Sequence, residues 1–265
     1  MNILKKVRVL LPVVFCLVTA AGGNYAQDAR SLTPRQLQLE KLSQQLNSAD
    51  VEDRRDALMK LRAMHRPEAS RLAQSALTDP LPMIRATAAA AVVSLPSEEA
   101  AGALLPLLND KDEFVRQQVA YTLGSTHSRT AVTPLTQALA DKMDSVRAAA
   151  AVALGEIADP SAVIPLADLL AGRAEKKRKS EKNEFVMRAA ARSLGQIGSR
   201  AAVPVLIEVV SNEKTPFDVR REAAHALGML GDASALPALR AASSSTDVYF
   251  ARAAMDAAKR INGGS

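Results

Sequence analysis

The sequence repeats itself every 31 residues, and this feature limits the possible folds more than any other. The recurring positions are Asp79, Asp110 and Asp141, together with Arg54, Arg85, Arg116 and Arg147. A constant gap of six residues separates the members of each pair, as between Asp110 and Arg116. A fixed period of about 20–50 residues is typical of proteins in which each repeat is one small unit stacked on its neighbours. The chain of 265 residues is therefore predicted to form an extended array.

Each repeat has the pattern of two helices separated by a break. In the fourth repeat, apolar residues follow one helical stripe over 146–157, and a second stripe runs over 163–170. The dipeptide Asp159-Pro160 interrupts the pattern between them. Aromatic residues make up 3% of the chain and Trp is absent, so the composition favours helix over sheet. The predicted fold is all-α: an α-solenoid, in which stacked helical hairpins form a right-handed superhelix.

The repeats define the expected organisation of the chain. The predicted units are 49–79, 80–110, 111–141, 142–172, 183–211 and 212–243. They form a repeat domain over 49–262 with a basic insertion at 173–182, and a final half-unit near 247–261. A capping helix is predicted over 32–47, with Thr33 as its N-cap and Pro34 as its first residue. Terminal units of such arrays are normally atypical.

Two stretches carry a resemblance to a known family. They are DSVRAAAAVALGEIADPSAVIPLADLL, over 144–170, and FDVRREAAHALGMLGDASALPALR, over 217–240. At these residues the chain resembles the HEAT-repeat superfamily, which is related to armadillo repeats, and in particular its phycobilisome-lyase-like HEAT repeats. The resemblance extends over roughly 49–261. It is specific for the fold and says little about function, because one fold can host many activities.

The resemblance implies a structural ladder between repeats. Asp79, Asp110 and Asp141 would pair with Arg85, Arg116 and Arg147, or with neighbours one unit away, and Arg220 would extend the set. The pattern is broken after the insertion, where Met187 replaces the arginine and Lys214 occupies the expected aspartate position. Val92-Val93 also replaces the Leu-Gly of other units. We therefore expect the ladder to be interrupted at the insertion, with a change of curvature there.

The first 26 residues have the pattern of a secretory signal peptide. Lys5, Lys6 and Arg8 precede an uncharged apolar run over 9–21. Cleavage after Ala20 and cleavage after Ala26 both fit, and a retained membrane anchor is the weaker interpretation because the run is short. The protein is therefore predicted to be exported to the periplasm or the cell exterior, without a membrane span after cleavage. Its one cysteine would be lost with the signal.

The positive charge is concentrated in the insertion. The formal net charge of +6 falls to +3 without the three basic residues of the signal, and the insertion RAEKKRKSEK contributes +4. The rest of the chain is nearly neutral, so no nucleic-acid partner is expected. Lys176, Lys177, Arg178 and Lys179 are consecutive. They fit either a solvated loop or a contact for an acidic partner.

The chain shows no pattern of catalytic residues. The HEAT-repeat deoxyhypusine hydroxylases, which belong to the same superfamily, hold iron through His-Glu pairs. Here His65, His127 and His225 are followed by Arg66, Ser128 and Ala226. We expect no metal and no cofactor, and His225 is predicted to be packed or half-exposed.

The predicted function is a scaffold that binds another protein through its curved helical surface. Second helices usually line the groove of such stacks, and the candidate positions there are Thr133, Gln137, Asp168, Glu208 and Arg240. The alternative is a lyase-like HEAT-repeat enzyme, or an enzyme subunit, acting on a bound cofactor or a protein substrate. A third possibility is a structural spacer with no single partner.

Overall fold

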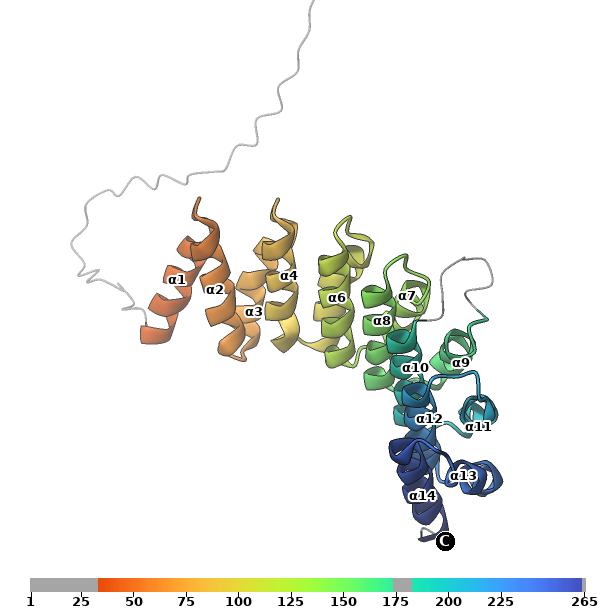
Figure 1. Ribbon diagram of the computed structural model, residues 1–265. Helices are drawn as coiled ribbons and strands as arrows, with labels where there is room; N and C mark the ends of the chain where they lie inside the picture. The colour runs from red at the N-terminus through yellow and green to blue at the C-terminus, as the bar shows by residue number, and fades with distance from the viewer. Residues whose placement is uncertain (1–32, 174–182, 264–265) are drawn as a thin grey trace, which may run out of the picture.

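The computed structural model describes residues 33–173 and 183–263, and all regular structure in these two ranges is helical. The predicted all-α solenoid is confirmed: helical hairpins follow one another along the stack without any strand in the described ranges (Figure 1). The proposed signal peptide and Lys176, Lys177, Arg178 and Lys179 lie outside the described residues.

The helices alternate between two layers. An N-terminal helix, α1 (Pro34–Leu46), precedes the first hairpin. The first helices of the hairpins are α2 (Val51–Ala63), α4 (Pro82–Ala91), α6 (Glu113–Thr126), α8 (Asp144–Ile157), α10 (Glu184–Ile197) and α12 (Phe217–Leu230), and α14 (Val248–Gly263) ends the series. The second helices are α3 (Pro67–Ala73), α5 (Ser97–Leu104), α7 (Val132–Ala138), α9 (Val163–Leu170), α11 (Val203–Ser211) and α13 (Leu236–Ala242). Short 3₁₀ turns adjoin most of them, such as η5 (Pro160–Ala162) before α9.

Local sequence determines where these helices begin and end. Thr33 caps α1 through a capping box with Gln36, and Pro34 takes the first position, where a missing N–H costs little. Helices α10 and α12 end at Gly198 and Gly231 in the left-handed conformation. This is the usual role of glycine after a helix, because it has no Cβ to clash there.

One apolar core runs through the whole stack. Each first helix turns one stripe toward the second helices, and in α2, α6, α8, α10 and α12 a leucine near the middle or end is fully buried, while Ile84 is the large buried residue of α4. These leucines are Leu58, Leu123, Leu154, Leu194 and Leu227. A single hairpin could not bury such a stripe, so every unit depends on its neighbours for its core.

Glycine lets consecutive first helices approach closely from α6 onward. A Cβ on Gly124 would lie 2.6 Å from Cα of Ala153 on α8, and a Cβ on Gly195 would lie 2.9 Å from Cα of Ala226 on α12. Real side chains do not reach such distances from a neighbouring backbone. A glycine opposite an alanine, or opposite Ser193 in the case of Gly155, therefore sets the spacing of these helices.

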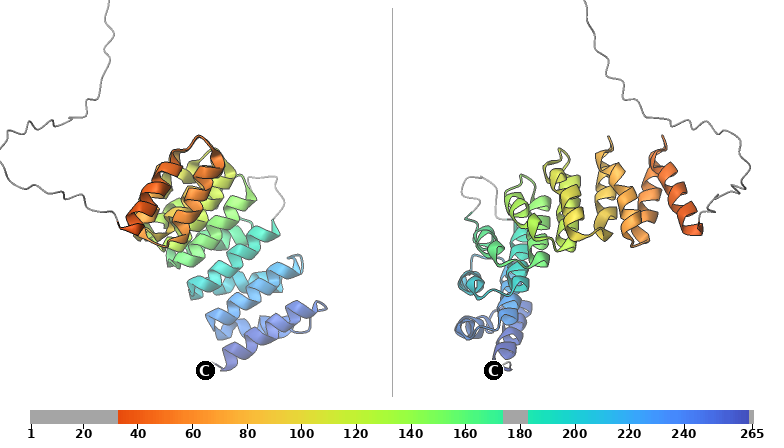
Figure 2. Two further views of the ribbon diagram at one scale, coloured as in Figure 1. Left: turned by 90° about the vertical axis from the view of Figure 1, so that its left-hand side faces the viewer. Right: turned by 180° about the vertical axis from the view of Figure 1, so that it is seen from behind.

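The stack changes direction near its middle. Figure 1 shows α1, α2, α4 and α6 side by side in one arm, with α10, α12 and α14 descending in a second arm. The turn lies around α8 and α10, which pack against each other; the insertion falls between α9 and α10 in the sequence. Helices α9, α11 and α13 lie along one side of the second arm, as the view from behind in Figure 2 also shows.

Candidate binding site

Buried Asp–Arg contacts connect the hairpins of the first arm. Nε and Nη2 of Arg85 donate to the two carboxylate oxygens of Asp110 at 2.7 and 2.8 Å. Nη1 of the same arginine donates to the carbonyl of Asp79 at 2.8 Å. Arg116 repeats this arrangement one unit later, with Asp141 and with the carbonyl of Asp110. Each aspartate thus accepts from two successive arginines, through its carboxylate and through its carbonyl.

These Asp–Arg pairs, which we call the rungs of the ladder, are nearly inaccessible to solvent. Arg85 and Arg116 are 8% and 5% exposed, and the first rung, from Nε of Arg54 to Asp79, spans 3.0 Å. Of the two pairings that the resemblance allowed, the structure has the second: each carboxylate pairs with the arginine 25 residues before it, at the start of the same unit. The gap of six residues separates each arginine from the aspartate whose backbone carbonyl it binds. A planar guanidinium matches a carboxylate with two parallel hydrogen bonds, so the pairs of Arg85 and Arg116 also fix the angle between units.

The rungs shift the pKa of their carboxyl groups. The hydrogen bond from Arg85 holds the pKa of Asp110 below its ordinary value, against the opposing effect of burial. Burial works to raise the pKa of Asp141, but hydrogen bonds from Arg116 and from the N–H of Met143 outweigh it and leave this pKa lowered as well. Both carboxylates are therefore charged at neutral pH.

The ladder changes at the insertion. Nη1 of Arg147 donates to the carbonyl of Asp141, and Nη2 donates to Asp144 on its own helix. Asp144 also accepts from the side chain of Asn183, which begins α10. The next arginine position is Met187, which is buried. Asp144 and Asn183 therefore make the polar joint between α8 and α10, which the repeat pattern did not indicate.

The aspartate position of the following unit falls on Asn212, and the assignment of Lys214 to it was wrong. Asn212 Oδ1 accepts from the N–H of Lys214, as Asp141 Oδ1 accepts from the N–H of Met143. The turn is the same in both places, but the carboxylate is missing from the second. The error arose because the loop before α12 is longer than in earlier units.

Arg220 stands at a ladder position but is not part of an Asp–Arg rung, which corrects the expectation. Its Nε donates to the carbonyl of Val210 at 2.9 Å. The guanidinium lies over the ring of Phe250, 4.4 Å from its centroid, and 5.5 Å from that of Phe217. Ser245 occupies the place of the aspartate and keeps only its turn-forming contact, to the N–H of Asp247 at 3.2 Å.

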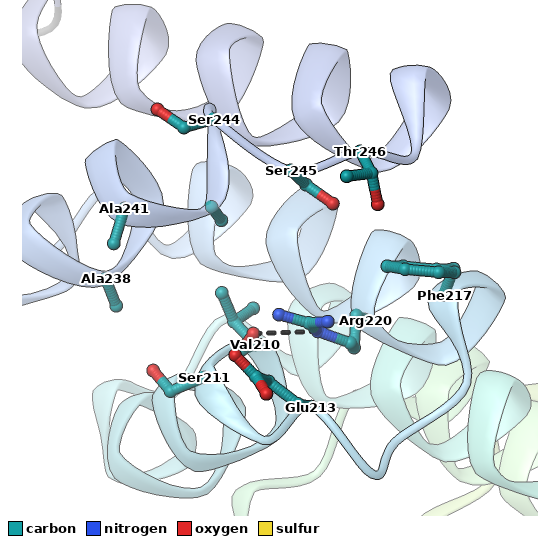
Figure 3. A pocket seen from close by; sticks show the side chains of 11 residues that line it. Val210, Ser211, Glu213, Phe217, Arg220, Ala238, Ala241, Ser244, Ser245 and Thr246 are labelled. Carbon is teal, nitrogen blue, oxygen red and sulfur yellow. Dashed lines mark hydrogen bonds between the residues drawn. The ribbon is translucent and has the colours of Figure 1, made fainter.

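A cavity of about 510 Å³ opens beside this guanidinium, and we call it the Arg220 pocket. Its lining residues are Val210, Ser211, Glu213, Phe217, Arg220, Ala238, Ala241, Ala242, Ser244, Ser245 and Thr246. Figure 3 shows Ser245 and Thr246 on the loop before α14, opposite the guanidinium. Burial lowers the pKa of Arg220 from its ordinary value, although the arginine remains a cation at any physiological pH.

The candidate residues of the second helices point to solvent. Thr133 and Gln137 are exposed on α7, Glu208 is exposed on α11 and Arg240 is exposed on α13. The structure brings only two of the set together: Nη1 and Nη2 of Arg173 lie 3.4 Å from Asp168 and 3.6 Å from Glu208. The repeat pattern gave no indication that Arg173 contacts these two acids.

These charges border a groove of about 260 Å³ between α9 and α11, which we call the α9–α11 groove. Its lining residues are Val163, Ile164, Ala167, Asp168, Arg173, Ala201, Pro204, Val205 and Glu208. Ile164 is 73% exposed there, although it belongs to an otherwise well-buried helix. The repeat pattern could have found it, since position 164 lies beside the buried stripe and should be polar.

The three histidines do not come together in a site. His225 is exposed on α12 and not packed, which corrects the expectation, and His65 is exposed as well. His127 is exposed and its Nδ1 lies 2.8 Å from the carbonyl of Glu156, a contact between units. Within the described ranges, no three acidic, histidine or cysteine side chains cluster as metal ligands would. No helix in those ranges is both long and apolar enough to cross a bilayer.

A family model for HEAT repeats matches residues 39–124, 102–184 and 178–259, and so nearly all of the described helices. The chain belongs to the HEAT-repeat family. The repeats, the buried ladder and the solenoid are thus one family pattern, and the resemblance to HEAT repeats is confirmed. No curated protein matches the HEAT-repeat chain by sequence.

Solved structures share the HEAT-repeat architecture. One is the complex of CpcE and CpcF of phycocyanin lyase from Nostoc sp. PCC7120, with 21% identity, a TM-score of 0.50, and coverage of 92% of this chain and 98% of that one. An engineered protein has 22% identity and a TM-score of 0.52, covering 84% and 68%. Human deoxyhypusine hydroxylase has 18% identity and a TM-score of 0.39, covering 86% and 96%. The first two likenesses show the fold alone, and nothing is built on the third.

Proposed function

We propose that the chain is an exported HEAT-repeat scaffold that binds a protein partner through the α9–α11 groove. The observation that carries this proposal is Ile164, whose side chain is 73% exposed in a hollow between two second helices. Burying a side chain of this size contributes about 1.5–3 kcal/mol. An isoleucine held in water on a rigid helix is therefore a ready anchor for a partner.

The surroundings of Ile164 have the composition of a protein interface. Apolar groups of Val163, Ala167 and Pro204 line the groove, and Asp168, Arg173 and Glu208 stand around it. An apolar centre with a polar rim is the common arrangement in such interfaces. The carboxylates lie 3.4 and 3.6 Å from Arg173, at the long end for ion pairs, so a partner can compete for either charge.

Export is part of the proposal and is supported by the N-terminal sequence. A basic start, an apolar run and small residues succeed one another over 1–26. A partner would then be met in the periplasm or outside the cell. The basic run of Lys176, Lys177, Arg178 and Lys179 follows Arg173 closely in sequence and stays a predicted contact for an acidic region of that partner.

Affinity capture with matched variants tests the proposal. The mature chain is immobilised, exposed to a cell-envelope extract, and the bound proteins are identified by mass spectrometry. Ile164→Asp is expected to lose the partner. Val248→Asp is the control, because Val248 is equally exposed, at 74%, but lies on α14. A partner retained by Ile164→Asp, or lost equally by both variants while their melting temperatures stay unchanged, would contradict the groove.

A second measurement addresses the basic run and the enzymatic alternative. Once a partner is known, replacing the four consecutive basic residues 176–179 by serine should weaken binding and flatten its salt dependence, since screened charges act mainly at low ionic strength. Unchanged affinity at low salt would remove the insertion from the interface. A purified protein that carries a bound chromophore would instead support the lyase-like alternative.

A further inference from the structure

The Arg220 pocket lies where the ladder lacks one carboxylate. In the first arm, each arginine meets an aspartate 25 residues later, as Arg85 meets Asp110 and Arg116 meets Asp141. The residue 25 positions after Arg220 is Ser245. Its hydroxyl accepts from the N–H two residues on, as the aspartates do, so the loop before α14 has the same turn and lacks only the acid.

The guanidinium of Arg220 is held on one side and open on the other. Nε is bound to the carbonyl of Val210, and Phe250 and Phe217 lie against the cation. Among the described residues, neither Nη1 nor Nη2 has a hydrogen-bond acceptor, and no carboxylate is within ion-pair distance of Arg220. A partly buried cation loses hydration, and this cost is offset only when its remaining donors are bound. The open Nη1–Nη2 edge is the part of a guanidinium that takes a carboxylate with two parallel hydrogen bonds.

The pocket has room for more than one water or one ion. Its volume of about 510 Å³ would accommodate a short peptide end. Ala238, Ala241 and Ala242 in its lining have small side chains and leave space for such a ligand. Ser245 and Thr246 place hydroxyl groups opposite the guanidinium (Figure 3). A hydroxyl can donate to a second carboxylate oxygen. The exposed side chains of Ser211 and Ser244 mark the mouth of the pocket.

We propose that the Arg220 pocket binds a carboxylate of a protein partner, which takes the place of the missing ladder aspartate. The carboxylate is either the C-terminus of a peptide or an acidic side chain. This site is separate from the α9–α11 groove, so a failed test of one leaves the other standing. Glu213, an exposed acid at the edge of the pocket, repels a bound carboxylate and so limits its affinity.

Isothermal titration with four defined probes tests the proposal on the mature chain. The probes are an acetylated tetrapeptide with a free C-terminus, its C-terminal amide, the same amide with one internal glutamate, and inorganic phosphate. Binding of the free-acid peptide alone indicates a terminal carboxylate, and binding of the glutamate peptide alone indicates a side chain. Binding of neither peptide, or tighter binding of phosphate than of both, would overturn the proposal.

Ser245→Asp is the decisive variant, because it is expected to fold. Aspartate forms the same turn at the equivalent positions, and here it would also reach Arg220 and complete a rung. We expect a higher melting temperature together with at least a tenfold loss of affinity for the carboxylate probe, since the donors are then occupied. Gln38→Glu adds the same charge at an exposed position of α1 and should leave the affinity unchanged. Full affinity in Ser245→Asp, alongside a raised melting temperature, would rule the site out.

Glu213→Gln gives an independent check. Removing the repelling charge should strengthen binding of the carboxylate probe several-fold. If Glu213 itself pairs with Arg220 in solution, the same change would lower the melting temperature without strengthening binding. That result would overturn the proposal, because the donors would not be free for a partner.

Discussion

The two arms of the solenoid are held together in different ways. In the first arm, buried ion pairs from Arg54 to Asp141 tie each first helix to the loop that leads into the next unit. In the second arm these rungs are replaced by close contact between first helices, where Gly195 lies against Ala226 and Gly228 against Ala257. Both kinds of contact meet at α6 and α8. One repeat fold can thus fix the angle between its units either by directed hydrogen bonds or by close approach of the backbones.

The loss of Arg116 should have the largest effect. Arg116→Ala removes the guanidinium's hydrogen bonds to the half-buried carboxylate of Asp141 and to the carbonyl of Asp110, and we expect the free energy of unfolding to fall by about 3–5 kcal/mol. Arg252→Ala is the control in the second arm, because its pair with Asp256 is exposed and should contribute about 0–1 kcal/mol. Urea denaturation of both variants measures the difference. Equal losses would show that the rungs do not distinguish the arms.

The glycine contacts should respond next. Gly124→Ala places a Cβ 2.6 Å from Cα of Ala153, and relief of that overlap should cost about 1–3 kcal/mol. Gly102→Ala is the matched change, because no atom lies within 4 Å of the new Cβ on α5. It should stabilise the chain by about 0.5–1 kcal/mol, since alanine loses less entropy in a helix. Thermal melts of the two variants should therefore move in opposite directions, and a parallel shift would count against the close approach.

Acid should weaken the first arm before the second. The pKa values of Asp110 and Asp141 are lowered in the folded chain, so the unfolded chain binds more protons as the pH falls. Their contribution is complete above the unfolded value of about 3.9 and is lost as the pH drops below it through the folded values. Residue-resolved hydrogen exchange from pH 6 to pH 3 should show earlier opening around α4 and α6. Asp110→Asn should flatten this dependence, and uniform opening along the stack would contradict it.

The smallest effect is expected at the ends of the first helices. Ala158 has the left-handed conformation, with φ of 58°, whereas the equivalent positions of the second arm are Gly198 and Gly231. That conformation costs alanine about 1–2 kcal/mol, and part of the gain from glycine is offset by its greater freedom in the unfolded chain. Ala158→Gly should therefore raise stability by about 1 kcal/mol or less in urea denaturation. A loss would show that a contact of the Ala158 methyl outweighs the strain.

The period of 31 residues made the fold predictable, because Asp, Arg, Leu and Gly recur together in register. It could not determine which oxygen of each aspartate meets which arginine, since gaps of 6 and 25 residues are both built into the same repeat. The structure shows that Asp110 uses both, through its carbonyl and its carboxylate. Packing in three dimensions, and not the spacing along the chain, separates the two contacts.

The candidate site was less predictable, because its residues depart from the repeat in different ways. Ser245 breaks the ladder by lacking a carboxylate, and that absence becomes visible only when each arginine is known to pair with the side chain 25 residues after it. Ile164 breaks the apolar pattern by facing water, which sequence periodicity alone reports as a small irregularity. Arg173 joins Asp168 to Glu208 across two units, and no repeat position encodes that contact.

The double use of each aspartate has a consequence for how such a chain can change its length. Arg116 holds the loop in front of its own helix with one nitrogen and the loop at the end of its unit with the other two. Each guanidinium thus closes a ring that is one repeat long. Duplication or deletion of a complete unit leaves each arginine bound to both of its aspartates. Duplication or deletion of part of a unit would remove one of these contacts and leave a buried charge unpaired. In the first arm, a change of length by whole units therefore keeps every one of these arginines paired.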